Sequence, residues 1–140
     1  MTPDLEEAVR RAAAAQNRRD FDAAVAVWAP DAVWELAPLG FGVFAGGHLI
    51  GHEAIRKSQE DLTEAFADFE SELEDHQDFG RGVTLGVLVQ RGRPHGSDAF
   101  VEARAGVVAI WRDGRIARVA AYEDVAEGRA AAERLAEERG

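Results

Sequence analysis

The chain has 140 residues, of which 46% are hydrophobic and 30% charged, a composition typical of a folded domain rather than of a disordered segment. It contains no cysteine, which excludes a disulfide framework, a cysteine-bound zinc or iron–sulfur centre and a thiol nucleophile. The formal net charge of −10 disfavours nucleic acid and anionic membrane surfaces as partners. We therefore expect one domain over residues 1–140 that binds neither of them.

The ends and the apolar runs of the chain bear on its location. The first residues are acidic and lack an apolar stretch, so no signal peptide is expected. The longest apolar run, from Ala105 to Trp111, is far too short to span a bilayer. Lys57 is the single lysine among the 16 basic residues, a usage typical of GC-rich bacterial genes. These features predict a cytoplasmic bacterial protein.

Helical periodicity dominates the first half of the chain. Apolar residues at helical spacing predict a first helix that ends near Arg18, and Asp20 can cap a second, shorter helix that ends before Pro30. The segments expected next are a short strand over 32–36, a glycine-rich loop over 37–50 and a third helix over 51–66.

Beyond Asp68 the apolar period changes from helical to alternating. Four strands are predicted, over 69–78, 82–92, 99–112 and 115–123. The pair Asp113-Gly114 indicates a tight hairpin between the last two strands, and the tail over 125–139 is predicted to be helical. Helices followed by a strand meander predict an α+β fold, with helices on one face of a curved sheet.

Three groups of residues, in order along the chain, form a recognisable pattern. They are Asn17-Arg18-Arg19-Asp20-Phe21 with Trp28-Ala29-Pro30-Asp31-Ala32-Val33-Trp34, then Gly51-His52-Glu53-Ala54-Ile55, and finally Trp111-Arg112-Asp113-Gly114-Arg115-Ile116 with Tyr122-Glu123-Asp124. The pattern resembles the SnoaL-like families of the nuclear transport factor 2-like superfamily. This resemblance implies a cone-shaped, cystatin-like α+β barrel, in which a curved mixed or antiparallel sheet wraps around the N-terminal helices. The superfamily contains isomerases, cyclases, epoxide hydrolases and non-catalytic binding modules, so the fold alone assigns no activity.

The resemblance also implies where acid and base groups would stand, and this chain has hydrocarbon there. The general base of ketosteroid isomerase and its two oxyanion-binding groups correspond to Leu36, Ala12 and Val107. The acid of the SnoaL-type cyclases corresponds to Ala121, and a partner of the epoxide hydrolase acid corresponds to Leu88. A leucine cannot abstract a proton, so the ketosteroid isomerase mechanism is not expected.

Strand alternation extends this prediction to the lining of the cone, because alternate residues share one face of a sheet. The predicted lining is apolar and rich in alanine, with room for a flat, even polycyclic, hydrophobic ligand, although a filled core fits the same pattern. The predicted ligand-binding residues are Trp34, Leu36, Phe41, Phe44, His48, Leu88, Ala105, Val107, Trp111, Val119 and Ala121.

Polar candidates within this lining are few. His48 and Tyr122 are the two candidate catalytic residues, although the strand parity of Tyr122 favours packing against a helix or an interface. His48 and His52 have the spacing of a helical metal pair but lack a third ligand, so we expect no metal and no cofactor. His76 lies in an acidic strand and is interpreted as solvent-exposed.

Val108 and Ile110 alternate onto the sheet face opposite the pocket. Apolar groups on both faces imply a cover for the second face, and in the resembling families this cover is often another subunit, so a homodimer is predicted. The leading hypothesis is a domain that binds an apolar small molecule. The alternative is a cofactor-free isomerase, cyclase or epoxide-hydrolase-type enzyme that acts on a hydrophobic metabolite through non-standard acid/base residues.

Overall fold

The structure is a computed structural model that describes residues 4–36 and 47–139. It begins with two helices, α1 (Leu5–Asn17) and α2 (Phe21–Val25). Each is capped by an aspartate whose carboxylate accepts a hydrogen bond from a first-turn amide, Asp4 from the Glu7 amide at 3.0 Å and Asp20 from the Ala23 amide at 3.2 Å. These bonds satisfy amides that have no partner inside a helix, which fixes where each helix starts.

The segment after α2 differs from the prediction. Strand β1 (Trp28–Leu36) begins before Pro30, not after it, and the predicted loop contains a further strand, β2 (Gly47–Ile50). Pro30 is tolerated because the pairing of β1 is irregular between Trp28 and Val33, so its missing N–H costs no ladder bond. Helix α3 (His52–Glu64) follows as predicted.

The second half of the chain follows the predicted order of elements. It consists of β3 (Glu70–Gly80), β4 (Val83–Gly92), β5 (Val101–Arg112), β6 (Arg115–Tyr122) and α4 (Val125–Arg139). The turn between β5 and β6 has positive φ at both Asp113 (55°) and Gly114 (79°), as the predicted two-residue hairpin requires.

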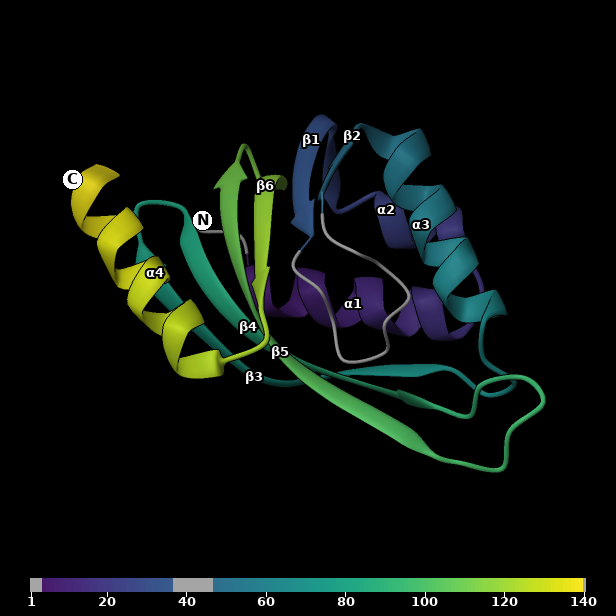
Figure 1. Cartoon of the computed structure of the whole chain (residues 1–140). Coiled ribbons are helices and arrows are strands. Elements are labelled where there is room, and N and C mark those ends of the chain that lie inside the picture. Colours follow the sequence, from purple (N-terminus) through teal and green to yellow (C-terminus); the bar gives the residue numbers. More distant parts are fainter. Residues whose placement is uncertain (1–3, 37–46, 140) are drawn as a thin grey trace.

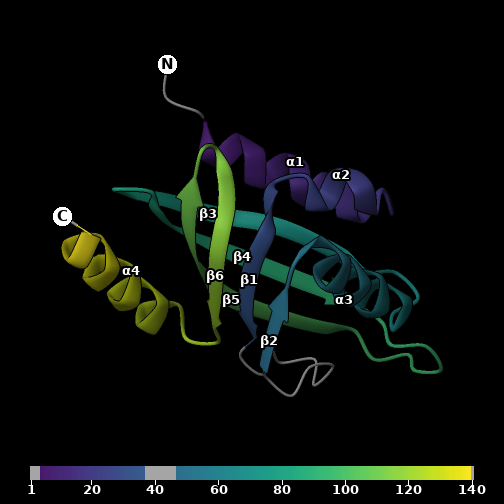
Figure 2. The ribbon, with the colours of Figure 1, turned by 90° about the horizontal axis from the view of Figure 1, so that it is seen from above.

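The strands form one six-stranded sheet in the order β2-β1-β6-β5-β4-β3. The pair β1–β6 is parallel and the other neighbours are antiparallel, so the sheet is mixed. The long strands β3, β4 and β5 curve along their length, with α1 on the concave side and α4 on the opposite side (Figures 1 and 2). This arrangement is the curved-sheet α+β fold that the sequence predicts.

Helix α4 covers part of the outer face of the sheet. Val108 is 2% exposed within the single chain because it packs under α4. A Cβ at Gly106 would lie 3.2 Å from the Cα of Val125, and one at Gly128 would lie 3.5 Å from the Cα of Gly106. The absence of a side chain at Gly106 therefore permits the start of α4 to lie directly against β5, whereas the distance at Gly128 is an ordinary van der Waals contact. None of the described helices is both long and apolar enough to cross a membrane.

Asn17, at the end of α1, secures the edge strand β3. Its amide nitrogen donates to the Ser71 carbonyl at 2.9 Å, and its amide oxygen accepts from the Ser71 backbone N–H at 2.8 Å. The side chain thereby pairs with the outer backbone groups of β3 as a neighbouring strand would. This contact fixes the distance between α1 and the sheet, and hence the space between them.

We expect Asn17→Ala to lower the free energy of unfolding by about 1–3 kcal/mol, because two partly buried backbone groups of Ser71 lose their partners. Arg18→Ala is the matched control, since Arg18 makes only an exposed 4.0 Å ion pair with Asp20 and its loss should change stability by less than about 0.5 kcal/mol. Urea denaturation of the two variants checks this. Equal stability of the two variants would contradict the role given to Asn17.

Candidate functional site

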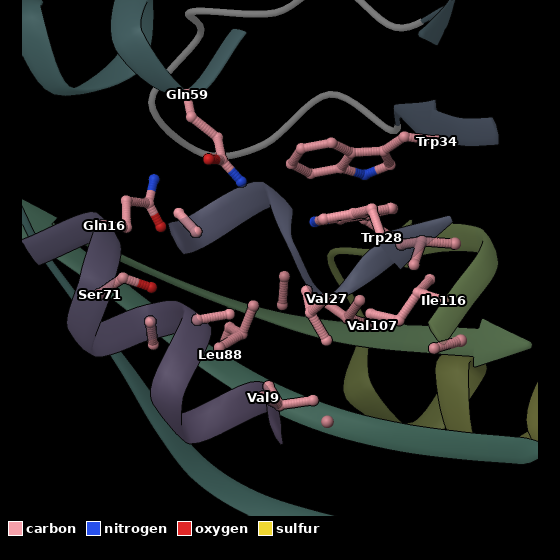
Figure 3. A pocket seen from close by; sticks show the side chains of 18 of the residues that line it. Val9, Gln16, Val27, Trp28, Trp34, Gln59, Ser71, Leu88, Val107 and Ile116 are labelled. Atoms are coloured by element: carbon pink, nitrogen blue, oxygen red, sulfur yellow. The ribbon is translucent and has the colours of Figure 1, made fainter. Parts of the chain in front are cut away.

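A cavity of about 110 Å³ lies between the first helices and the concave face of the sheet. Figure 3 shows Gln16, Ser71 and Gln59 toward one end of this cavity, and the rings of Trp28 and Trp34 with Ile116 toward the other. The lining residues are Val9, Ala12, Ala13, Gln16, Ala24, Val27, Trp28, Trp34, Gln59, Ser71, His76, Thr84, Gly86, Leu88, Gln90, Ala105, Val107, Ala109, Ile116, Val119 and Ala121.

Small side chains on the sheet leave this space open. Ala105, Ala109 and Ala121 line it from β5 and β6, and the indoles of Trp28 and Trp34 line it from β1. Trp28 and Trp34 stack on each other with centroids 5.3 Å apart and an interplanar angle of 28°. Stacked rings form a rigid wall that cannot collapse onto the alanines, so the volume between them remains.

The structure brings most of the sequence-predicted lining together. Six of the predicted ligand-binding residues line the cavity, and so does Ala12. The six are Trp34, Leu88, Ala105, Val107, Val119 and Ala121. Binding of a ligand by these residues stays a prediction. Phe41 and Phe44 lie outside the described residues, and of Leu36 and His48 only the strand backbone is described.

Two predicted residues lie elsewhere. Trp111 is buried but is not among the lining residues, and its indole N–H donates to the Thr84 hydroxyl at 2.8 Å. A register shift between Ile110 and Trp111 breaks the alternation on which its placement rested. Tyr122 packs on the outer face of the sheet beside Leu135 of α4, as its parity favours, and so it does not reach the cavity.

His76 lines the cavity, and the expectation of a solvent-exposed side chain was wrong. Its side chain is only 5% exposed. The reason is a β-bulge in β3, where Leu73 pairs with Leu88 but Asp75 pairs with Val87. The extra residue reverses the strand parity, so His76 turns inward beyond the bulge.

The neighbour of His76 on β4 is a glycine, whose missing side chain leaves room for Leu73 rather than for the imidazole. His76 pairs with Gly86, and a Cβ at Gly86 would lie 4.0 Å from the Cδ2 atom of His76 and 3.2 Å from the Cδ1 atom of Leu73. The cavity is less apolar than the predicted lining, because polar side chains and one imidazole line it. The imidazole enters the cavity from β3, and it is the only ionisable group among the described lining residues.

Three buried polar side-chain atoms have no hydrogen-bond partner in the described structure, and all three belong to lining residues. They are Trp34 Nε1, Gln59 Oε1 and His76 Nε2. They come from β1, α3 and β3, so unrelated elements converge on one space. Buried polar groups are nearly always hydrogen-bonded, and an unpaired one costs about 1–3 kcal/mol. The cavity is therefore suited to an occupant with polar groups of its own.

The charges around His76 determine its ionisation. Burial lowers the pKa of His76, and the carboxylate of Glu6 partly opposes this effect. Glu6 Oε1 lies 4.0 Å from His76 Nδ1, while Glu6 Oε2 forms a 3.0 Å ion pair with Arg10. The neutral imidazole is therefore the favoured form at neutral pH.

The remaining described histidines and acids form no metal site. His52 Nε2 lies 2.6 Å from the Trp28 carbonyl and anchors the start of α3 to β1. Within residues 4–36 and 47–139, no group of three or more His, Asp or Glu side chains could hold a metal ion.

A pH dependence of stability follows from His76. Because its pKa is lower in the folded than in the unfolded chain, the unfolded chain binds more protons below about pH 6.5, and stability falls as the pH falls. We expect the free energy of unfolding of His76→Leu to fall less between pH 7.5 and 5.5 than that of the parent chain, as measured by urea denaturation at both pH values. The control is His95→Asn, at an exposed position, and its free energy of unfolding should fall as much over this pH range as that of the parent chain. An unchanged loss in His76→Leu would contradict the buried placement.

Comparisons with known proteins place this geometry in a family. Residues 9–119 match the family described as the SnoaL-like domain. No curated protein matches the chain.

Solved structures share the fold. A hypothetical protein with a ketosteroid isomerase-like fold from Catenulispora acidiphila, in complex with trimethylamine, is 16% identical, with coverage of 87% of this chain and 86% of that one and a TM-score of 0.71. A nuclear transport factor 2-like protein of unknown function from Burkholderia pseudomallei is 20% identical, with coverage of 90% and 95% and a TM-score of 0.72.

A third structure, of a protein provisionally named as a polyketide cyclase from Sinorhizobium meliloti, is 25% identical, with coverage of 86% and 94% and a TM-score of 0.63. The family match spans most of the chain, and the cavity lies where its elements converge. The chain belongs to the SnoaL-like domain family.

Proposed function

We propose that this domain binds a small, mainly apolar molecule in the cavity between α1, α3 and the concave face of the sheet. The observation that carries the proposal is the set of three unpaired polar atoms that line this one cavity. A tightly packed core would have no reason to bury them, whereas a ligand with polar groups satisfies them.

The size of the cavity bears on the size of the ligand. Its volume of about 110 Å³ is of the same order as an engineered protein cavity of about 150 Å³ that holds benzene. We therefore expect one ring of the ligand to fill the enclosed part. Further rings of a polycyclic ligand would extend beyond the residues that line it.

An enzyme that acts on a hydrophobic metabolite is the second candidate, and His76 favours it. The imidazole of His76 would be a non-standard acid/base group for this family. It comes from β3, whereas the resemblance places the functional groups of related enzymes at the positions of Ala12, Val107 and Ala121. A neutral imidazole can accept a proton near neutral pH. A turnover rate that falls as the pH falls through the His76 titration, and a loss of turnover in His76→Leu, would support this candidate.

Filling the cavity tests the binding proposal. Ala121 is 6% exposed and lines the cavity, so leucine at this position occupies ligand space. We expect Ala121→Leu to lose binding of toluene, an apolar probe of one ring, as followed by amide shifts in NMR titrations. The matched control is Ala120→Leu, because Ala120 is adjacent on β6 but faces the outer groove, and toluene binding should persist. Binding by Ala121→Leu at the parent affinity would contradict the proposal.

A homodimer remains a proposal as well. Helix α4 covers Val108, but Ile110 lies in a groove on the outer face beside Ala120, Arg118 and Glu35. Light scattering should report a dimer for the parent chain and a smaller species for Ile110→Glu, because a buried carboxylate would oppose association. A monomeric parent chain would contradict the proposal.

A further inference from the structure

We propose that His76 presents Nε2 to the cavity as a hydrogen-bond acceptor, in a tautomer set by Glu6, and that the ligand is an uncharged ring compound with a hydroxyl donor. This inference rests on the proposed function and specifies the class of its ligand. The geometry that carries it is the position of the imidazole between a carboxylate on one side and the cavity on the other.

The carboxylate of Glu6 is held in place by Arg10, one turn further along α1. The Arg10 Nε donates to Glu6 Oε2 at 3.0 Å, and an Arg10 terminal nitrogen donates to the Leu73 carbonyl of β3 at 2.9 Å. Arg10 thus ties α1 to β3 just before the bulge. The second oxygen of Glu6, Oε1, then faces His76 Nδ1 at 4.0 Å.

This arrangement selects one tautomer. A negative oxygen near Nδ1 favours the proton on that nitrogen, which leaves Nε2 with its lone pair. The Nε2 atom is buried and has no partner within the described residues. An acceptor that is buried without a donor is the feature that a hydroxyl group of a ligand would satisfy.

Several other charged groups surround the imidazole, and their combined effect on the pKa of His76 still leaves the ring neutral. Desolvation lowers the pKa of His76, as does the positive charge of Arg10, whereas Glu6, Asp78 and Asp4 raise it. The largest of these influences is desolvation, so the ring is neutral at neutral pH. The facing residue on β4, Gly86, brings no charge.

The rest of the lining favours an uncharged ligand. Most of the walls are aliphatic or aromatic, and none of the described lining residues other than His76 is ionisable. A carboxylate or an ammonium group would therefore lose its hydration without gaining a counter-charge, which is strongly unfavourable. The unpaired N–H of Trp34 would in turn take an acceptor group of such a ligand.

The experiment compares phenol with toluene, which differ by a hydroxyl in place of a methyl group. NMR titrations give the dissociation constants of both probes for the parent chain and for His76→Leu. We expect the variant to weaken phenol binding roughly threefold to tenfold relative to toluene, the value of one hydrogen bond. His76→Gln, whose amide oxygen replaces the acceptor, should restore part of the phenol affinity.

The tautomer is tested separately. In the parent chain, ¹⁵N NMR should show a proton on His76 Nδ1 and none on Nε2. Glu6→Gln should shift this balance toward Nε2 and lower phenol affinity relative to toluene. Glu7→Gln is the matched control, because Glu7 pairs with Arg11 at 3.1 Å in the same helical spacing but the structure gives it no contact with His76. Equal effects of the two variants would overturn the role of Glu6.

The outcomes separate the two proposals. If neither toluene nor phenol binds the parent chain, the proposed function fails. If toluene binds but His76→Leu leaves the relative affinity of phenol unchanged, only the inference about His76 fails. Phenol affinity relative to toluene should fall as the pH falls through the His76 titration, because a protonated Nε2 cannot accept. Benzoate that binds the parent chain more tightly than phenol, and increasingly so at lower pH, would overturn the assignment of an uncharged ligand.

Discussion

The inner face of the curved sheet carries side chains that are too small to fill the space beneath α1, and the candidate site depends on this shortage of volume. Ala105, Ala109 and Ala121 provide methyl groups where larger residues would close the cone. The stacked indoles of Trp28 and Trp34 cannot deform to compensate, because aromatic rings pack as rigid plates. A void between rigid walls persists, and a void of this kind is what a ligand requires.

The bulge in β3 determines the chemistry of that void. One extra residue between Leu73 and Asp75 moves His76 to the inner face, and the side chain of Glu74 remains outside, where it pairs with Arg104 at 2.6 Å. The same strand therefore keeps its acidic residues in solvent and delivers one imidazole to the interior. The burial of that imidazole changes its ionisation and couples the site to the stability of the fold.

Much of the fold was predictable because local patterns carry it. The alternation beyond Asp68 predicted β3 to β6, and Asp113-Gly114 predicted their last hairpin, since its positive φ values suit few other residue pairs. The alanines of the lining followed from the same alternation. The start of β1 was not predictable, because Pro30 normally ends regular structure and only the irregular pairing with β6 permits it.

The sequence by itself determined the α+β class and the order of the helices and strands other than β2 and the start of β1. The tertiary structure alone decided that His76 faces the cavity, that α4 covers Val108, and that Glu6 stands beside the imidazole. The physical reason is the range of the forces involved. Periodicity and turn chemistry act between residues close in sequence, whereas a bulge, a covered face and a carboxylate beside a neutral imidazole depend on strands and helices that meet only in the folded chain.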